Sequence, residues 1–216
     1  MKEFFTEGST VLFYGDSITD AGRDKENGRD LGKGYAAKLA ALYSVLFPNQ
    51  RIRFFNRGVS GNVSAELLKR YEKDLLALKP RYVFILIGIN DTWHGWAEGN
   101  PISAEVTRSH VRELIRRIRN DLEGTQVIVL KPWLLDSDPA KISWHEDFDR
   151  KGEYLASVGQ EYADLWIDIP SAFQKDMERG DAAQEKICPD GVHPSDYGHG
   201  LMALEILKRI GCIDCE

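Results

Sequence analysis

Near the N-terminus, Val11-Leu12-Phe13-Tyr14 runs directly into Gly15-Asp16-Ser17-Ile18-Thr19, and this segment indicates the fold class. An unbroken apolar run that ends in a glycine turn predicts a strand buried on both of its faces. Similar apolar runs follow later in the chain, at residues 52–55, 82–87, 127–130 and 165–169. Such strands are typical of a parallel sheet that helices cover on both sides.

Helical periodicity fills the segments between these strands. Apolar residues recur at three- and four-residue spacing at 35–47, 64–78, 104–122, 145–162 and 195–210. The alternation of strand and helix with short connections predicts a three-layer αβα fold, of class α/β, around a doubly wound sheet of about five parallel strands. No internal repeat or linker interrupts the 216 residues, so we expect one domain over residues 1–216.

The charge balance of the chain excludes some classes of partner. Lys and Arg number 28 against 34 Asp and Glu, which gives a formal net charge of −6. Nucleic-acid binding needs clustered positive charge, so we expect no nucleic-acid partner. No apolar stretch approaches the roughly 20 residues of a membrane span, and the acidic segment 1–7 does not resemble a signal peptide. We therefore expect a cytoplasmic protein without a membrane partner, and free thiols at Cys188, Cys212 and Cys215.

Polar motifs stand where the predicted strands end. In open α/β sheets, ligands bind beyond the carboxyl ends of the strands, so residues at these ends are expected to meet in one site. Three motifs follow the first three strands and a fourth precedes the last helix: Gly15-Asp16-Ser17-Ile18-Thr19, Asn56-Arg57-Gly58-Val59-Ser60-Gly61-Asn62, Gly88-Ile89-Asn90-Asp91 and Asp190-Gly191-Val192-His193-Pro194. Their order and common placement indicate one convergent site.

Ser17 and His193 have the chemistry of a nucleophile and its base. A serine hydroxyl needs a base to attack at neutral pH. His193 can be that base, and Asp190, three residues earlier, can orient its ring. The alternatives are that Ser17 is a turn or N-cap residue, and that Asp190 and His193 form half of a metal site or a surface turn. The other histidines show no spacing that completes a zinc site, so we expect no metal.

Attack on an ester carbonyl creates an oxyanion, which needs preorganised hydrogen-bond donors. The candidate donors are the backbone N–H groups of Ser17 and Gly61 and the side-chain amide of Asn90. Gly61 can bring its N–H close because no side chain intervenes. The alternatives are loop flexibility for Gly61 and capping or turn chemistry for Asn90.

The four motifs resemble those of the GDSL, or SGNH, hydrolase family, whose letters Ser, Gly, Asn and His match Ser17, Gly61, Asn90 and His193. The resemblance implies a flavodoxin-like fold with a five-stranded parallel sheet. It also implies that Ser17 is the nucleophile, that His193 is the general base with Asp190 as its partner, and that Ser17, Gly61 and Asn90 form the oxyanion hole. No cofactor is implied.

A narrower resemblance concerns the substrate. Four stretches are similar to the bacterial intracellular acetylxylan esterases: residues 15–20 followed by Gly22-Arg23, Asn56-Arg57-Gly58-Val59-Ser60-Gly61-Asn62, Gly88-Ile89-Asn90-Asp91-Thr92-Trp93 and His193-Pro194-Ser195. This implies a serine esterase that acts on a small acylated substrate and removes acetyl groups from carbohydrates such as acetylated xylo-oligosaccharides. Thioesterases and lysophospholipases of the same family stay open, as does a catalytically silent binding protein of this fold. Relatives are sometimes oligomeric, so a homo-oligomer is also left open.

Side chains near the motifs are candidates for substrate binding. Trp93 and Trp96 are expected in the loop after Asn90, and Trp133 after the fourth strand. Aromatic faces there can stack on a sugar ring or shape a small acyl pocket, although core packing is the alternative for each of them. We assign substrate binding to Asp16 and Trp93.

Overall fold

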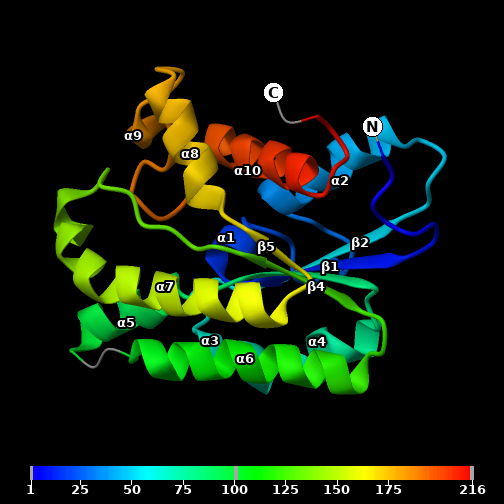
Figure 1. Ribbon diagram of the computed structural model, residues 1–216, viewed down its shortest axis with the longest axis horizontal. Helices are drawn as coiled ribbons and strands as arrows, with labels where there is room; N and C mark the ends of the chain where they lie inside the picture. The colour runs from blue at the N-terminus through cyan, green and yellow to red at the C-terminus, as the bar shows by residue number, and fades with distance from the viewer. Residues whose placement is uncertain (1, 100–101, 215–216) are drawn as a thin grey trace.

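The computed structural model describes residues 2–99 and 102–214. Its centre is a five-stranded sheet in the order β2-β1-β3-β4-β5, in which every strand pairs in parallel with its neighbour. The strands are Thr10–Gly15 (β1), Arg53–Gly58 (β2), Tyr82–Leu86 (β3), Gln126–Leu130 (β4) and Leu165–Ile167 (β5). Helices flank both faces of the sheet (Figure 1), so the predicted αβα architecture is confirmed.

One face of the sheet packs against α2, α8 and α10, which lie together above the strands in Figure 1. These helices span Tyr35–Leu46, Ile169–Glu178 and Asp196–Arg209. Phe13 of β1 and Phe84 of β3 point to this side and stack with their ring centroids 5.3 Å apart. Burial of this apolar layer from water holds the three helices on the sheet.

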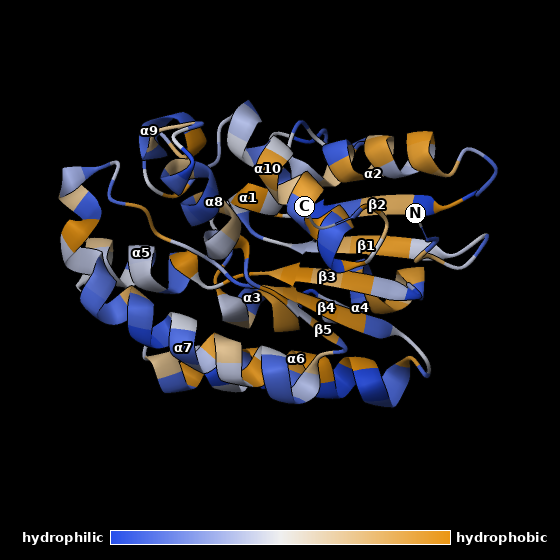
Figure 2. Ribbon diagram, turned by 45° about the horizontal axis from the view of Figure 1, so that its top comes forward, coloured by the Kyte–Doolittle hydropathy of each residue, from blue (hydrophilic) through white to orange (hydrophobic). Residues whose placement is uncertain are grey.

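The opposite face packs against four further helices. They are α3 (Ser64–Lys69), α4 (Tyr71–Asp74), α6 (Ala104–Asp121) and α7 (His145–Tyr162). Leu12 and Tyr14 of β1 lie in this second core, because successive residues of a strand point to opposite faces. In Figure 2, strands β1, β3 and β4 are mostly apolar, as burial on both faces requires.

Two predicted boundaries are wrong. The strand expected at 165–169 ends at residue 167, because the carboxylate of Asp168 accepts a hydrogen bond from the backbone N–H of Ser171 at 3.3 Å and so caps α8. The apolar pattern did not predict that helix. The helix expected at 64–78 is divided into α3, α4 and the 3-10 helix η1 (Leu76–Leu78).

Asn90 and the tryptophans after it lie on a helix, α5 (Ile89–Glu98), and not in a loop. Gly88 turns the chain from β3 into this helix with a φ of +127°, a conformation that other residues rarely adopt. The expectation of a loop for Trp93 and Trp96 is therefore wrong. The remaining short helices are Ser17–Asp20 (α1), the 3-10 helix Pro139–Trp144 (η2) and Gln184–Ile187 (α9). Among the described residues, no helix has the length and apolar character to cross a membrane.

Candidate active site

Ser17 lies at the carboxyl end of β1, as the first residue of α1. Asp16 caps this short helix, since its Oδ1 accepts a hydrogen bond from the N–H of Ile18 at 3.0 Å. Gly15 is required by close approach: a Cβ there would lie 2.3 Å from the carbonyl oxygen of Leu86. N–H groups in the first turn of a helix have no acceptor within the helix, which leaves the N–H of Ser17 without one inside α1.

The side chains of Ser17, His193 and Asp190 form a chain of hydrogen bonds. Ser17 Oγ lies 3.0 Å from His193 Nε2, and His193 Nδ1 lies 2.7 Å from Asp190 Oδ2. Asp190 Oδ1 closes the turn, because it accepts from the backbone N–H groups of Val192 at 3.0 Å and His193 at 2.7 Å. In this geometry a histidine can take the proton of a hydroxyl while a carboxylate fixes its ring.

The contacts within this trio shift the pKa values of its base and its acid. The hydrogen bond to Asp190 raises the pKa of His193 above its ordinary value, against the opposing effect of partial burial. Burial alone would raise the pKa of the Asp190 carboxyl, but hydrogen bonds from the ring and backbone of His193 and from the backbone of Val192 outweigh it and lower that pKa. Asp190 is therefore ionised where His193 titrates, and its charge favours the imidazolium form.

A cavity of about 330 Å³ opens beside the Ser17 hydroxyl. Its lining consists of Ser17, Ser60, Gly61, Asn90, Trp93, His94 and His193. Gly61 has a φ of +82°, so the backbone at this wall depends on glycine. Asn90 is 5% exposed, and its amide donates to the carbonyl oxygen of Asn62 at 3.1 Å. Because an amide nitrogen carries two hydrogens, one of them remains for a ligand in the cavity.

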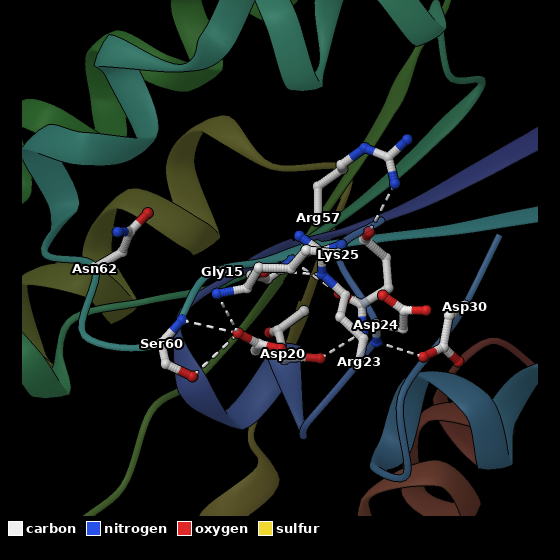
Figure 3. A network of polar contacts seen from close by, with 12 residues as sticks. Gly15, Asp20, Arg23, Asp24, Lys25, Asp30, Arg57, Ser60 and Asn62 are labelled. Carbon is white, nitrogen blue, oxygen red and sulfur yellow. Dashed lines mark hydrogen bonds and ion pairs between the residues drawn. The ribbon is translucent and has the colours of Figure 1, made fainter. Parts of the chain in front are cut away.

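Asp20 holds the Ser60 side of the cavity. Its Oδ2 accepts hydrogen bonds from the backbone N–H of Ser60 at 3.1 Å and from the Ser60 hydroxyl at 3.0 Å. The same oxygen lies 3.5 Å from the Nζ of Lys25, and Figure 3 shows it between the two partners. Arg23 adds a hydrogen bond from its Nε to the carbonyl oxygen of Gly58 at 3.0 Å. The turn that carries Gly61 is thereby fastened to the segment that follows α1.

Arg70, between α3 and α4, fastens the same turn to the sheet. Its Nε donates to Asn62 Oδ1 at 2.7 Å, and its terminal nitrogens donate to the carbonyl oxygens of Gly15 at 2.8 Å and Arg57 at 2.6 Å. The guanidinium carbon lies 4.3 Å from the centroid of the Tyr14 ring. The fixed fork of a guanidinium suits such divergent contacts, and this one joins the ends of β1 and β2 to the turn before α3.

Asp91, next to Asn90 on α5, joins three helices. Its carboxylate accepts from the N–H of Ser64 at 2.9 Å, the hydroxyl of Ser64 at 2.5 Å and the hydroxyl of Thr107 at 2.9 Å. Because the Ser64 hydroxyl donates to Asp91, the ring nitrogen Nδ1 of His110, 2.9 Å away, is the donor to Ser64. The Ser64 proton thus points to the Asp91 carboxylate and not to the His110 imidazole, so this group anchors α5 and lacks the serine–histidine arrangement of an activated nucleophile.

The residues assigned to substrate binding differ in their placement. Asp16 has no exposed surface, its Oδ2 has no hydrogen-bond partner, and burial raises the pKa of its carboxyl to about 7. A carboxylate enclosed in this way presents no surface to a ligand, so Asp16 does not suit the expected contact with substrate. Trp93 does line the cavity, with its ring centroid 5.8 Å from that of His193 and 5.2 Å from that of Trp144.

Other candidate side chains lie away from the cavity. Trp133 is buried in the core, and Trp96 is 42% exposed on α5. Cys188 and Cys212 are buried free thiols, whereas Cys215 lies outside the described residues. Over residues 2–99 and 102–214, no three His, Cys, Asp or Glu side chains gather as a metal site would require.

Some residues at the site carry no signal in the sequence. Lys141 lies in η2 with 9% of its side chain exposed, and its Nζ donates to the backbone oxygen of Asp190 at 2.9 Å. Arg70 belongs to the same group, and the contacts of Asp20, which lies within the first of the four similar stretches, were not predicted either. Their partners are distant in sequence and are largely backbone atoms, and the order of residue types does not predict contacts with backbone atoms.

The sheet order and the flanking helices are those of GDSL/SGNH hydrolases. A structure from Parabacteroides merdae, described as a GDSL-like lipase, has a TM-score of 0.90 and 30% identity, and covers 96% of this chain and 97% of that one. An acetylxylan esterase from Geobacillus stearothermophilus is 31% identical over 215 residues, or 94% of each chain. Its crystal structure has a TM-score of 0.85 at 28% identity and covers 99% of this chain and all of that one.

The fold, of class α/β with a five-stranded parallel sheet, therefore places the protein among the hydrolases of GDSL/SGNH type. The GDSL-like lipase/acylhydrolase family matches residues 13–201, so the chain belongs to that family, whose members are carboxylic ester hydrolases. The resemblance that the four motifs carry is confirmed.

Proposed function

We propose that this protein is a serine esterase that hydrolyses small acyl esters, and that its substrates are acetylated carbohydrates such as xylo-oligosaccharides. The observation that carries the proposal is the 3.0 Å contact between Ser17 Oγ and His193 Nε2, with Asp190 Oδ2 2.7 Å from the other ring nitrogen. A hydroxyl, an imidazole and a carboxylate in this order are the groups that perform acyl transfer through serine.

In the acylation step, Ser17 Oγ bonds to the carbonyl carbon of the ester, and the hydroxyl proton passes to His193 Nε2. The carbonyl oxygen becomes an oxyanion, which accepts hydrogen bonds from the N–H groups of Ser17 and Gly61 and from the amide of Asn90. When the oxyanion collapses, the bond to the leaving alcohol breaks and His193 gives its proton to that oxygen. The acyl group remains on Ser17.

Deacylation repeats these steps with water. The oxygen of a water molecule attacks the acyl carbon while His193 Nε2 takes a proton from that water. The oxyanion donors of the acylation step then stabilise the second oxyanion. Its collapse breaks the bond to Ser17 Oγ, which recovers a proton from His193, and the acid leaves. Asp190 stays ionised throughout and stabilises the imidazolium.

The lining of the cavity supports a small acyl group on a sugar. Of the lining residues that the structure describes, only Trp93 is large and apolar, and its face beside His193 suits a sugar ring or a short acyl chain. The relative from Geobacillus stearothermophilus is an acetylxylan esterase, which favours an acetylated xylo-oligosaccharide. Structures of that enzyme with a serine or a histidine replaced by alanine are described as catalytic mutants, in keeping with the roles of Ser17 and His193 here.

A thioesterase or lysophospholipase is the second candidate, because the family and one of the similar structures are described as lipases. A long acyl chain needs an extended apolar surface near the nucleophile, and a single large apolar side chain, Trp93, among the described lining residues does not favour it. The hydrogen bond between Ser17 and His193 disfavours a catalytically silent binding protein.

The test is the initial rate of hydrolysis of p-nitrophenyl acetate and p-nitrophenyl octanoate, with Ser17→Ala as the blank. We expect a high Ser17-dependent rate on p-nitrophenyl acetate and a low rate on p-nitrophenyl octanoate. In a second assay, the protein should release acetate from acetylated xylo-oligosaccharides. A preference for octanoate would transfer the assignment to a lipid or thioester substrate. If Ser17→Ala kept full activity, the assignment of the nucleophile would be wrong.

A further inference from the structure

Lys141 brings a buried positive charge to the edge of the catalytic trio. Only 9% of its side chain is exposed, and its Nζ lies 2.5 Å from Asp138 Oδ2 and donates to the backbone oxygen of Asp190 at 2.9 Å. The same nitrogen lies 5.2 Å from the ring centroid of Trp93 and 5.8 Å from that of Trp144. One ammonium group thus contacts both the turn that carries the base and the aromatic wall of the cavity.

The burial of this group has an energetic cost that its contacts must offset. Removing an ammonium from water is unfavourable, and a single carboxylate seldom compensates for it in full. Asp138 is itself 32% exposed, so its attraction to Lys141 is partly screened. The carbonyl of Asp190 and the faces of two indoles supply the other favourable contacts. The contacts of Lys141 therefore join Asp138 to the Asp190 turn and to the two indoles.

We propose that Lys141 is a positioning residue, which fixes the turn 190–193 relative to the ring of Trp93 and whose charge opposes the carboxylates around His193. The inference rests on the proposed function, in which His193 is the base and Trp93 is a wall of the substrate site. Lys141 acts through these neighbours and not on the substrate itself. Its effect should be visible in the titration of His193 and in the reactivity of Ser17.

Charged groups of both signs surround the imidazole of His193. The carboxylates of Asp190 and Asp16 raise the pKa of His193, and the ammonium of Lys141 lowers it. Because a nearby positive charge disfavours the imidazolium form, loss of the Lys141 charge should move the titration of His193 to higher pH.

Two other histidines and one carboxylate also face this region. His199 on α10 has its pKa lowered to about 4, chiefly by burial, so it is neutral where His193 titrates. His94 lines the cavity from α5. Asp138 interacts with the charges of both Lys141 and Asp190. Loss of the Asp138 charge leaves Lys141 uncompensated, which should move the titration of His193 to lower pH.

The decisive experiment follows the imidazole NMR signal of His193 against pH in the full chain, with His193→Gln to identify the signal. We expect a higher midpoint in Lys141→Met, a lower midpoint in Asp138→Asn, and a midpoint close to that of the unmodified protein in Lys141→Arg. The matched control is Lys131→Met, which removes a half-exposed lysine paired with Asp168 at 3.5 Å and should leave the midpoint unchanged.

The two charge changes distinguish electrostatic positioning from general loosening of the structure. If Lys141→Met and Asp138→Asn shifted the midpoint in the same direction, or by no more than the Lys131→Met control, the proposal would be overturned. Should Lys141→Met fail to fold by far-ultraviolet circular dichroism, Asp138→Asn and Lys141→Arg still decide it: a lower midpoint in the first with an unchanged midpoint in the second supports the proposal, and an unchanged or higher midpoint in Asp138→Asn overturns it.

A kinetic readout tests the positional part of the proposal. Loss of a hydrogen bond from a charged donor should slow the labelling of Ser17 by a fluorophosphonate about 10-fold in Lys141→Met at the plateau pH. Lys141→Arg should restore most of that rate, and an unchanged rate in Lys141→Met would refute positioning. If the unmodified protein hydrolyses no ester, the proposed function fails, whereas the NMR midpoints still test Lys141 independently.

Discussion

The imidazole of His193 must be neutral to accept the Ser17 proton, and its hydrogen bond to Asp190 raises its pKa. The protonated form of His193 dominates below that pKa, so kcat/KM for p-nitrophenyl acetate should fall as the pH drops through it. We expect the midpoint of this acid limb to lie above about 6.5, the ordinary value for histidine. A rate that stays flat down to about pH 4 would exclude His193 as the base.

Replacement of Asp190 should change both the rate and the pH profile. Asp190→Asn removes the charge that favours the imidazolium, so the acid limb should move to lower pH, and the plateau rate should fall about 10²- to 10⁴-fold. Asp181→Asn is the matched control, because that carboxylate pairs with Arg179 away from the trio. An unshifted acid limb in Asp190→Asn would contradict the geometry described for the pair.

The side-chain amide of Asn90 is the third group at the site whose contribution can be measured. Asn90→Ala removes one of three proposed oxyanion donors, and kcat on p-nitrophenyl acetate should fall about 10²- to 10³-fold. The exposed Asn49, between α2 and β2, provides a control in Asn49→Ala, which should leave the rate unchanged. An Asn90→Ala variant with full activity would remove Asn90 from the oxyanion hole.

Two of the proposed oxyanion donors lie at the amino ends of helices: Gly61 precedes α3, and Asn90 lies in the first turn of α5. Asp91 connects these two ends through its hydrogen bonds with Ser64. Ser64→Ala removes the hydroxyl that donates to Asp91 at 2.5 Å and leaves a buried carboxylate with one partner fewer. We expect a loss of about 1–3 kcal/mol in the free energy of unfolding by urea, together with a lower kcat because Asn90 neighbours Asp91. Ser157→Ala on α7, whose hydroxyl donates to the nearby carbonyl of Tyr154, is the control and should change neither quantity appreciably. Equal stability of the two variants would show that Asp91 does not depend on Ser64.

Packing of the helical layers on the sheet can be tested at two glycines of α7. A Cβ at Gly159 would lie 2.1 Å from Cε3 of Trp166 on β5, whereas a Cβ at Gly152 would meet nothing within 4 Å. Gly159→Ala should therefore destabilise the protein by about 1–3 kcal/mol. Gly152→Ala should stabilise it by about 0.5–1 kcal/mol, because alanine favours the helix. Urea unfolding measures both changes, and two changes of the same sign would be inconsistent with this packing.

The layered architecture could be predicted from the order of apolar residues along the chain. Residues such as Leu12, Phe13 and Tyr14 must all be buried, and a continuous apolar run is compatible with few structures other than a strand covered on both faces. The order of the motifs also identified Ser17, His193 and Asp190 as one group, because the ends of parallel strands meet at one edge of the sheet. That residues 1–216 form one domain stays a prediction, as do the roles of the site residues in catalysis.

The distant atoms that these side chains contact depend on how the helices and strands pack in three dimensions. It placed Trp93 on α5 and enclosed Asp16, two outcomes that the sequence patterns did not predict. It also brought Lys141 to the backbone oxygen of Asp190, and Arg70 to that of Gly15. A periodic pattern of apolar residues indicates which positions of a helix or strand face the core, because the local geometry of that element places them on one side. A contact with a backbone oxygen far along the chain leaves no such pattern, because every residue carries that oxygen.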